Sequence, residues 1–144
     1  MSKKHIYFYY LDQPFAELMN FYYSNMIIDG KSWRTVEHYF QAMKSLDVTI
    51  QQKIRNLKTP KLAKEMGQKV ELRSDWDEIK EEVMLKALRA KFSQNSRLKA
   101  ILLSTEDAIL HEDAPKDKYW GVKGKDRLGK LLMIVREEFK NEIG

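Results

Sequence analysis

Cysteine is absent from all 144 residues of the sequence, and this absence excludes several classes of site at once. Without a thiol the chain can form no disulfide bond, thiolate nucleophile or zinc–thiolate cluster. Its three histidines, His5, His38 and His111, are far apart, and no two have the spacing of a metal-ligand pair. We therefore expect neither a metal ion nor another cofactor.

Long apolar runs are also lacking. The apolar and aromatic stretch from Ile6 to Leu11 is too short for a signal peptide and has no small-residue cleavage site. A later run, from Leu131 to Val135, is far shorter than a membrane span. We expect a cytoplasmic protein, and the sequence leaves its oligomeric state open.

The composition fits one folded domain over residues 1–144, because 43% of the residues are apolar and no linker or internal repeat interrupts the chain. Twenty-six Lys and Arg against 21 Asp and Glu give a net charge of +5. This excess suits an anionic partner, and either a nucleic acid or a phosphate on a small ligand would satisfy it.

The pattern of residues predicts an α+β fold that is predominantly α-helical, with a small antiparallel sheet in the N-terminal third. A strand is expected from His5 to Tyr10, and Asp29-Gly30 is typical of a tight hairpin turn between two further short strands. Helices are predicted from about 36 to 46, 48 to 57, 60 to 67, 75 to 92, 96 to 103 and 128 to 139.

Three polar residues share one face of the helix that begins near Val36, since Glu37, Gln41 and Lys44 are spaced at i, i+4 and i+7. On its own, such a stripe is typical of a solvated helix face. Aromatic neighbours, among them Tyr39, favour partial burial instead, and a buried carboxylate or amine needs a partner or a task.

The segment from Ala108 to Arg127 has little helical periodicity and is predicted to be a long functional loop. Glycine and cations precede the last helix, so free backbone N–H groups there are expected to bind an anion; a flexible basic surface turn is the alternative. Residues 124–130 match the start of a phosphate-binding loop, but Leu131 replaces the required Ser or Thr, which excludes a nucleotide triphosphatase.

Several motifs together resemble the NADAR or YbiA-like family of N-glycosidases, in the family's order and over about residues 15 to 140. They are Asn20-Phe21, Asp29-Gly30-Lys31-Ser32-Trp33, Glu37-His38-Tyr39-Phe40-Gln41 with Lys44, Trp76, Ala90-Lys91-Phe92, Asp117 with Trp120-Gly121, and Leu128-Gly129-Lys130-Leu131-Leu132-Met133. Two positions depart from the family: Met19 stands where Ser is usual, and Asp126 stands where Asn is usual.

The resemblance implies hydrolysis of the N-glycosidic bond between a phosphorylated ribose and its base. Two substrates follow from it, a ribosylamino-pyrimidine phosphate of riboflavin biosynthesis and ADP-ribose attached to guanine. From the chemistry of such a reaction, catalysis is assigned to Glu37, as base or stabiliser of the sugar charge, to Asp117, as proton donor or water orienter, and to Lys44, whose amine offers an alternative route through a Schiff base. Substrate binding is assigned to Asn20, Trp33, Tyr39, Gln41, Trp120, Gly121, Lys123, Lys125, Asp126 and Arg127.

Two other functions use the same residues differently. A non-catalytic module that binds ADP-ribose or nucleic acid would need the basic loop and the aromatic residues, but not the Glu37 and Lys44 pair. A purely structural helical protein is the weakest alternative, because it would leave the long polar loop without a purpose.

Overall fold

The computed structural model describes residues 3–143, with the side chain of residue 143 left out, and the chain forms two compact units. One unit runs to Tyr22 and resumes at Ser96, and the other spans Tyr23–Asn95. No helix within residues 3–143 has the length and apolar character needed to cross a bilayer. The single domain expected from the composition stays a prediction.

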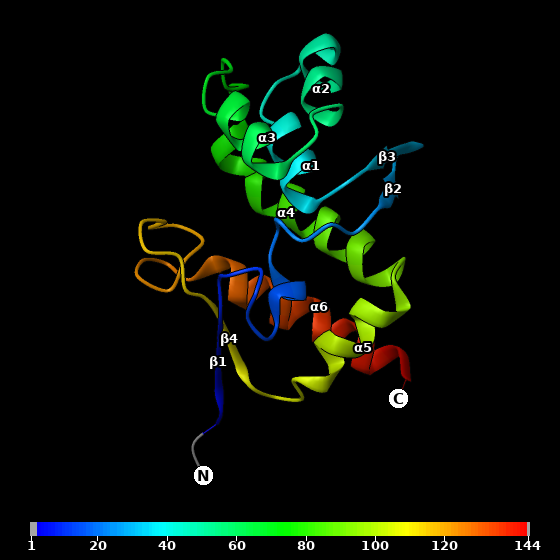
Figure 1. Ribbon diagram of the computed structural model, residues 1–144, viewed down its shortest axis with the longest axis vertical. Coiled ribbons are helices and arrows are strands. Elements are labelled where there is room, and N and C mark those ends of the chain that lie inside the picture. The colour runs from blue at the N-terminus through cyan, green and yellow to red at the C-terminus, as the bar shows by residue number, and fades with distance from the viewer. Residues whose placement is uncertain (1–2, 144) are drawn as a thin grey trace. The chain divides into compact units, whose positions relative to one another are not determined.

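The first unit is a parallel strand pair packed against a long helix. Strand β1 (His5–Phe8) lies beside β4 (Ile109–Glu112), with Tyr7 opposite His111, and the unit also holds a 3-10 turn, η1 (Ala16–Leu18), and two helices, α5 (Ser96–Ser104) and α6 (Arg127–Ile143) (Figure 1). Helix α6 packs on β4 so closely that a Cβ at Gly129 would overlap the carbonyl oxygen of Leu110.

The second unit is a hairpin followed by four helices. Strands β2 (Met26–Ile28) and β3 (Lys31–Trp33) are antiparallel, and the helices are α1 (Val36–Ala42), α2 (Val48–Arg55), α3 (Pro60–Gly67) and α4 (Trp76–Ser93). Asp29 and Gly30 have φ values of 51° and 80°, the positive values that the predicted hairpin turn requires. The antiparallel sheet in the N-terminal third is thereby confirmed.

Helix α1 lies at the centre of the second unit, where it contacts α2, α3 and α4. Thr35 caps it by accepting the His38 N–H at 3.1 Å, as its sequence predicts. All seven residues of α1 are buried, including the polar ones. The polar stripe is therefore not a solvated face, and the burial expected from its aromatic neighbours is confirmed.

Three local predictions need correction. The first strand does not join the hairpin but pairs with β4, which lies inside the segment predicted to be a loop, because a four-residue strand has too little periodicity to reveal itself. Helix α1 ends at Ala42 rather than near Leu46, so Lys44 lies in the turn that follows. The third correction concerns the anion site at the start of α6 and is described with the loop below.

Candidate functional site

Glu37 and Gln41 form the polar centre of the second unit. They lie one turn apart on α1, and the Gln41 amide Nε2 donates to Glu37 Oε2 at 2.6 Å. Both side chains are buried, with only 7% and 4% of their surface exposed. A hydrogen bond this short in a buried setting orients the carboxylate and compensates part of the free energy of burying it.

Gly67, at the end of α3, gives the Gln41 amide the room it needs. A Cβ at position 67 would overlap Gln41 Oε1, so only glycine admits this side-chain conformation. Gln41 Oε1 is itself buried and accepts no hydrogen bond from the residues that the structure describes. It is therefore a buried acceptor whose hydrogen-bonding capacity the described residues leave unfilled.

Lys44 lies just past α1 and is half-buried. Its Nζ is 5.9 Å from the centre of the Phe40 ring. Burial lowers the pKa of Lys44, Glu37 partly opposes this shift, and the like charge of Lys64 adds to it. A lysine with a lowered pKa has a larger share of the neutral amine, which is the nucleophilic form.

Trp33 and Tyr39 are the aromatic members of this group. Their rings meet edge to face with centroids 5.2 Å apart, and Trp33 Nε1 is buried without a hydrogen-bond partner among residues 3–143. Burial raises the pKa of Tyr39, and the positive charge of Lys86 partly opposes this shift. Lys86 itself forms an ion pair with Asp29, with Nζ 2.8 Å from Oδ2. Tyr39 is therefore a neutral hydrogen-bond donor near neutral pH.

His38, on the same helix, has a structural task. Its Nδ1 is 2.7 Å from Thr35 Oγ1 and its Nε2 is 2.9 Å from the carbonyl oxygen of Leu57. Burial lowers the pKa of His38, so its ring is neutral. The ring links α1 to Leu57, which follows the end of α2. No three His, Asp or Glu side chains in the described part of the chain are placed to hold a metal ion.

The loop between β4 and α6, residues 113–126, is fixed by its own backbone. The N–H groups of Gly124, Lys125 and Asp126 donate to carbonyls of residues 118 and 121, and those of Arg127 and Leu128 donate to carbonyls of residues 119 and 120. The expectation of free N–H groups at this helix start is therefore wrong for Arg127 and Leu128, because the loop folds back and its carbonyls accept both. Phosphate binding at this loop stays a prediction.

Asp117 organises the same loop. Its Oδ1 accepts the N–H groups of Tyr119 and Trp120 at 3.0 and 2.8 Å. An oxygen that accepts two amide groups has no proton to donate, so any proton transfer from Asp117 would use its other oxygen. Tyr119 and Trp120 meet edge to face with centroids 4.8 Å apart, and Lys125 Nζ lies 5.3 Å from the Tyr119 ring centre.

Asp126 belongs to a chain of hydrogen bonds that sequence reasoning did not predict. Asp126 Oδ2 is 2.5 Å from His111 Nδ1, and His111 Nε2 is 2.9 Å from His5 Nδ1. The two imidazole rings are stacked 5.1 Å apart, and Tyr7 stacks on His111 at 4.8 Å. A carboxylate is a stronger acceptor than an amide for an imidazole N–H, so Asp126 suits this network.

The sequence-predicted residues thus fall into two groups, one in each unit. Those of the second unit lie on α1 or next to it in the chain. Those of the first unit lie in the turn after η1, in the loop before α6 and at the first residue of α6. The second-unit group is Trp33, Glu37, Tyr39, Gln41 and Lys44; the first-unit group is Asn20, Asp117, Trp120, Gly121, Lys123, Lys125, Asp126 and Arg127. Asn20 is buried, whereas Lys123 and Lys125 are exposed to solvent.

Comparison with known proteins identifies the family. The NADAR domain profile matches residues 7–140, which is nearly the whole chain. The chain belongs to the NADAR family. Among NADAR relatives, the N-glycosidase YbiA of Escherichia coli (strain K12) is 45% identical over 141 residues, which cover 94% of this chain and 88% of YbiA.

Two further NADAR relatives extend the comparison. An N-glycosidase of Nostoc punctiforme is 39% identical, with 94% of this chain and 93% of the relative covered. A riboflavin biosynthesis protein of Vibrio vulnificus is 38% identical over 94% of this chain but only 38% of its own length. The NMR structure of E. coli YbiA matches with a TM-score of 0.90 at 44% identity and covers 99% of this chain and 88% of that one, which confirms the predominantly helical NADAR fold.

Proposed function

We propose that this protein is an N-glycosidase that hydrolyses the bond between a phosphorylated ribose and its base. The observation that carries the proposal is the buried Glu37–Gln41 pair on α1, followed by Lys44 with its lowered pKa. The family supports the same reaction, since relatives up to 45% identical are named N-glycosidases.

Cleavage of an N-glycosidic bond builds positive charge on the anomeric carbon and leaves an electron-rich base. A carboxylate near the sugar stabilises that charge or activates the attacking water. Glu37 is assigned this task, because its hydrogen bond from Gln41 holds it in one orientation. Gln41 Oε1, which has no hydrogen-bond partner among the described residues, is assigned to a ribose hydroxyl.

Lys44 supports a second route to the same products. In this route the neutral amine attacks the anomeric carbon, the bond to the base breaks, and the base takes one of the two amine protons. The bond between the anomeric carbon and the ring oxygen then breaks, the ring oxygen takes the second proton, and a Schiff base to the opened ribose remains. Water then adds to the imine carbon, releases the ribose aldehyde and regenerates the amine. Both routes consume one water and need no metal ion.

The remaining roles follow the chemistry of the side chains. Trp33, Tyr39 and Trp120 are proposed to contact the base or ribose by stacking, and Asn20 to bond a hydroxyl. The cations Lys123, Lys125 and Arg127 are proposed for the phosphate, with Gly121 and Asp117 shaping the loop that carries them. Asp126 retains one buried oxygen, Oδ1, that accepts no bond from residues 3–143 and is proposed to accept one from the substrate.

The substrate is proposed to be a ribosylamino-pyrimidine phosphate of riboflavin biosynthesis, with ADP-ribose on guanine as the second candidate. The riboflavin biosynthesis protein of V. vulnificus supports the first, although this chain covers only 38% of that protein. A cytoplasmic location is part of the proposal, and cell fractionation tests it.

One experiment decides between these possibilities. The pure protein is incubated without added metal with the pyrimidine substrate and, separately, with guanine-ADP-ribosylated DNA, and the released base is followed by mass spectrometry. Release from the first substrate supports metabolite hydrolysis, and release from the second alone supports removal of ADP-ribose. Binding without release from either substrate would contradict the enzyme proposal and favour the non-catalytic module.

A further inference from the structure

A pocket of about 540 Å³ lies along β1 and the turn that follows it, entirely within the first unit. It is lined by Lys4, His5, Ile6, Tyr7, Tyr9, Tyr10, Gln13, Pro14, Phe15 and Asp113. Residues 109–112 of β4 are not among them, so the pocket follows the edge of β1 that faces away from β4. None of these residues belongs to the proposed hydrolytic machinery.

The backbone of β1 offers hydrogen-bonding groups to this pocket. The carbonyls of Lys4 and Phe8 accept the N–H groups of Ile109 and Asp113 at 2.8 and 2.9 Å, so the even-numbered residues of β1 face β4. Because alternate residues of a parallel strand direct their backbone groups to opposite edges, His5 and Tyr7 present N–H and C=O groups to the pocket. Alternating donors and acceptors along an edge match the hydrogen-bonding edge of a nucleobase.

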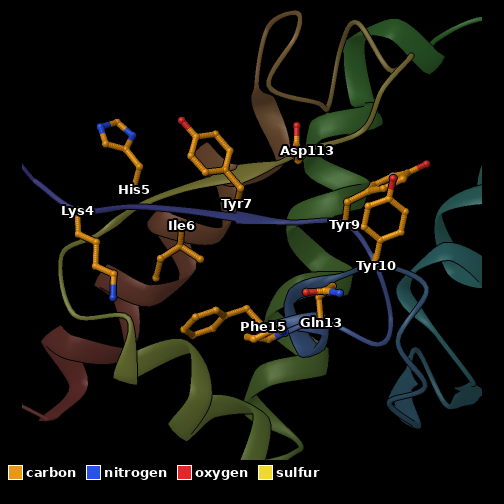
Figure 2. Close-up of a pocket in the computed structure, with 10 residues that line it drawn as sticks. Lys4, His5, Ile6, Tyr7, Tyr9, Tyr10, Gln13, Phe15 and Asp113 are labelled. Atoms are coloured by element: carbon orange, nitrogen blue, oxygen red, sulfur yellow. The ribbon is translucent and has the colours of Figure 1, made fainter.

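Aromatic rings supply flat surfaces beside this edge. Tyr7 and Tyr10 are 54% and 60% exposed, and Tyr9 and Tyr10 pack edge to face with centroids 5.0 Å apart. Figure 2 shows Tyr9 and Tyr10 together at one end of the strand, with His5 and Tyr7 projecting from one side of it and Lys4 and Ile6 from the other. Exposed rings of this kind are the platforms on which unpaired bases stack.

The platform is held in place before any ligand arrives. Asp126 fixes His111, His111 fixes His5, and Tyr7 stacks on His111 at 4.8 Å. Rings that are already oriented lose little conformational entropy when a ligand binds. Phe15, in the turn below, has a φ of 68°, a left-handed conformation that is strained for a bulky residue and that clusters at ligand sites.

Charged side chains in the pocket also suit the polar groups of a nucleotide. Lys4 provides a cation for a phosphate, and Asp113 provides an acceptor for an exocyclic amino group. From these observations we infer that the pocket along β1 binds a nucleobase that carries a phosphate, either as a free nucleotide or within a single-stranded nucleic acid. This inference does not depend on the proposed N-glycosidase activity.

The test measures binding with two probes that separate the two sources. AMP is titrated into ¹⁵N-labelled protein, with the amide signals of His5 and Tyr7 as the reporters, and a short fluorescein-labelled single-stranded oligonucleotide is titrated by anisotropy. Binding of AMP identifies a free-nucleotide site. Binding of the oligonucleotide without AMP identifies a site for a nucleic acid strand.

Variants connect that binding to the pocket. Tyr7→Ala and Tyr10→Ala are each expected to weaken binding by about 10-fold, since stacking on one aromatic ring contributes about that much. Tyr7→Phe keeps the ring and is expected to bind like the wild type. The matched control is Tyr23→Ala, because Tyr23 is 53% exposed but lies in the other unit.

Several outcomes would overturn the inference. They are the absence of binding by both probes, or binding that stays at the wild-type level in Tyr10→Ala. Should Tyr7→Ala fail to fold, the exposed Tyr10 position decides alone, with its melting temperature as the check on folding. Release of base from the pyrimidine substrate is assayed separately, so a failure of the proposed hydrolysis cannot be mistaken for a failure of this site.

Discussion

Glu37 is the residue whose charge the proposed hydrolysis requires most directly. Glu37→Gln removes the charge but keeps the shape, and Gln41 can still donate to the new amide oxygen. We expect kcat to fall by about 100-fold or more, the usual effect of removing one electrostatic contact to a transition state, with KM little changed. Steady-state kinetics with Glu65→Gln, an exposed glutamate of α3, as control makes the measurement. Wild-type activity in Glu37→Gln would remove this residue from the mechanism.

Lys44 gives a prediction about pH. If its amine is the nucleophile, kcat rises with pH while the amine loses its proton and levels off above the pKa, which burial places below that of an exposed lysine. Lys64 contributes to the lowering, so Lys64→Gln should move the rising limb to higher pH without affecting the plateau.

Covalent trapping checks the same amine independently. Borohydride added during turnover should leave a stable adduct on the wild type, visible by mass spectrometry, and none on Lys44→Arg. A pH profile unmoved by Lys64→Gln, together with no trapped adduct, would favour direct attack by water under the control of Glu37.

At the residue scale, sequence patterns predicted contacts between side chains that are close together in the chain. Glu37 and Gln41 are four residues apart, so helical periodicity alone brings them together. His5 and His111 are 106 residues apart, and their contact exists only because β1 pairs with β4. No periodic pattern encodes such a pair, and only the departure at Asp126 marked the position in advance.

Among the elements, α3 and α1 are coupled through Gly67. Alanine in a helix is normally more stable than glycine by about 1 kcal/mol. At position 67 we expect the opposite, a loss of about 1–3 kcal/mol, because the added Cβ displaces the Gln41 amide. The displaced amide can no longer orient Glu37, so kcat should fall as well.

A double-mutant cycle isolates this contact. Denaturant unfolding of Gly67→Ala, Gln41→Ala and the double variant gives the coupling free energy. Gln41→Ala removes the overlap with Oε1 and Cδ, so Gly67→Ala should cost less in that background, although the Gln41 Cβ would still lie 2.9 Å from the new Cβ. If Gly67→Ala costs as much in the Gln41→Ala background as in the wild type, the Gln41 amide is not what the added Cβ displaces, and Gly67 does not position it.

Elements with strong local signals were predicted well, and those defined by distant pairing were not. Helix α3 has its predicted limits, since Thr59 caps it, Pro60 opens it and Gly67 ends it. Strand β4 was expected to be loop, because four residues cannot show a period and the partner strand lies about a hundred residues earlier. The compact backbone of the loop before α6 was missed for a similar reason. The carbonyls of residues 118–121 accept hydrogen bonds from the N–H groups of residues 124–128, and no sequence pattern predicts these bonds.

On the scale of the whole molecule, the net charge of +5 makes a prediction about salt. For a small phosphorylated substrate we expect kcat/KM to fall only weakly with NaCl concentration, because few counterions are released. A single-stranded nucleic acid would give a log–log slope of about −0.7 for each phosphate contacted. Measurement of kcat/KM over a series of NaCl concentrations distinguishes the two substrates. If the salt dependence is steep, Lys123→Ser and Lys125→Ser should each make it less steep.

The loop from Asp113 to Asp126 keeps its shape mainly through bonds between its own amides and carbonyls, and the Asp117 side chain adds bonds from the amides of Tyr119 and Trp120. Its exposed lysines, at positions 116, 118, 123 and 125, contribute their charges without setting the path of the chain. Those side chains, and with them the proposed contacts to the phosphate, can therefore change while the backbone of the loop keeps its path. Enzymes with this fold can in this way differ in the substrate that they accept while they share one backbone.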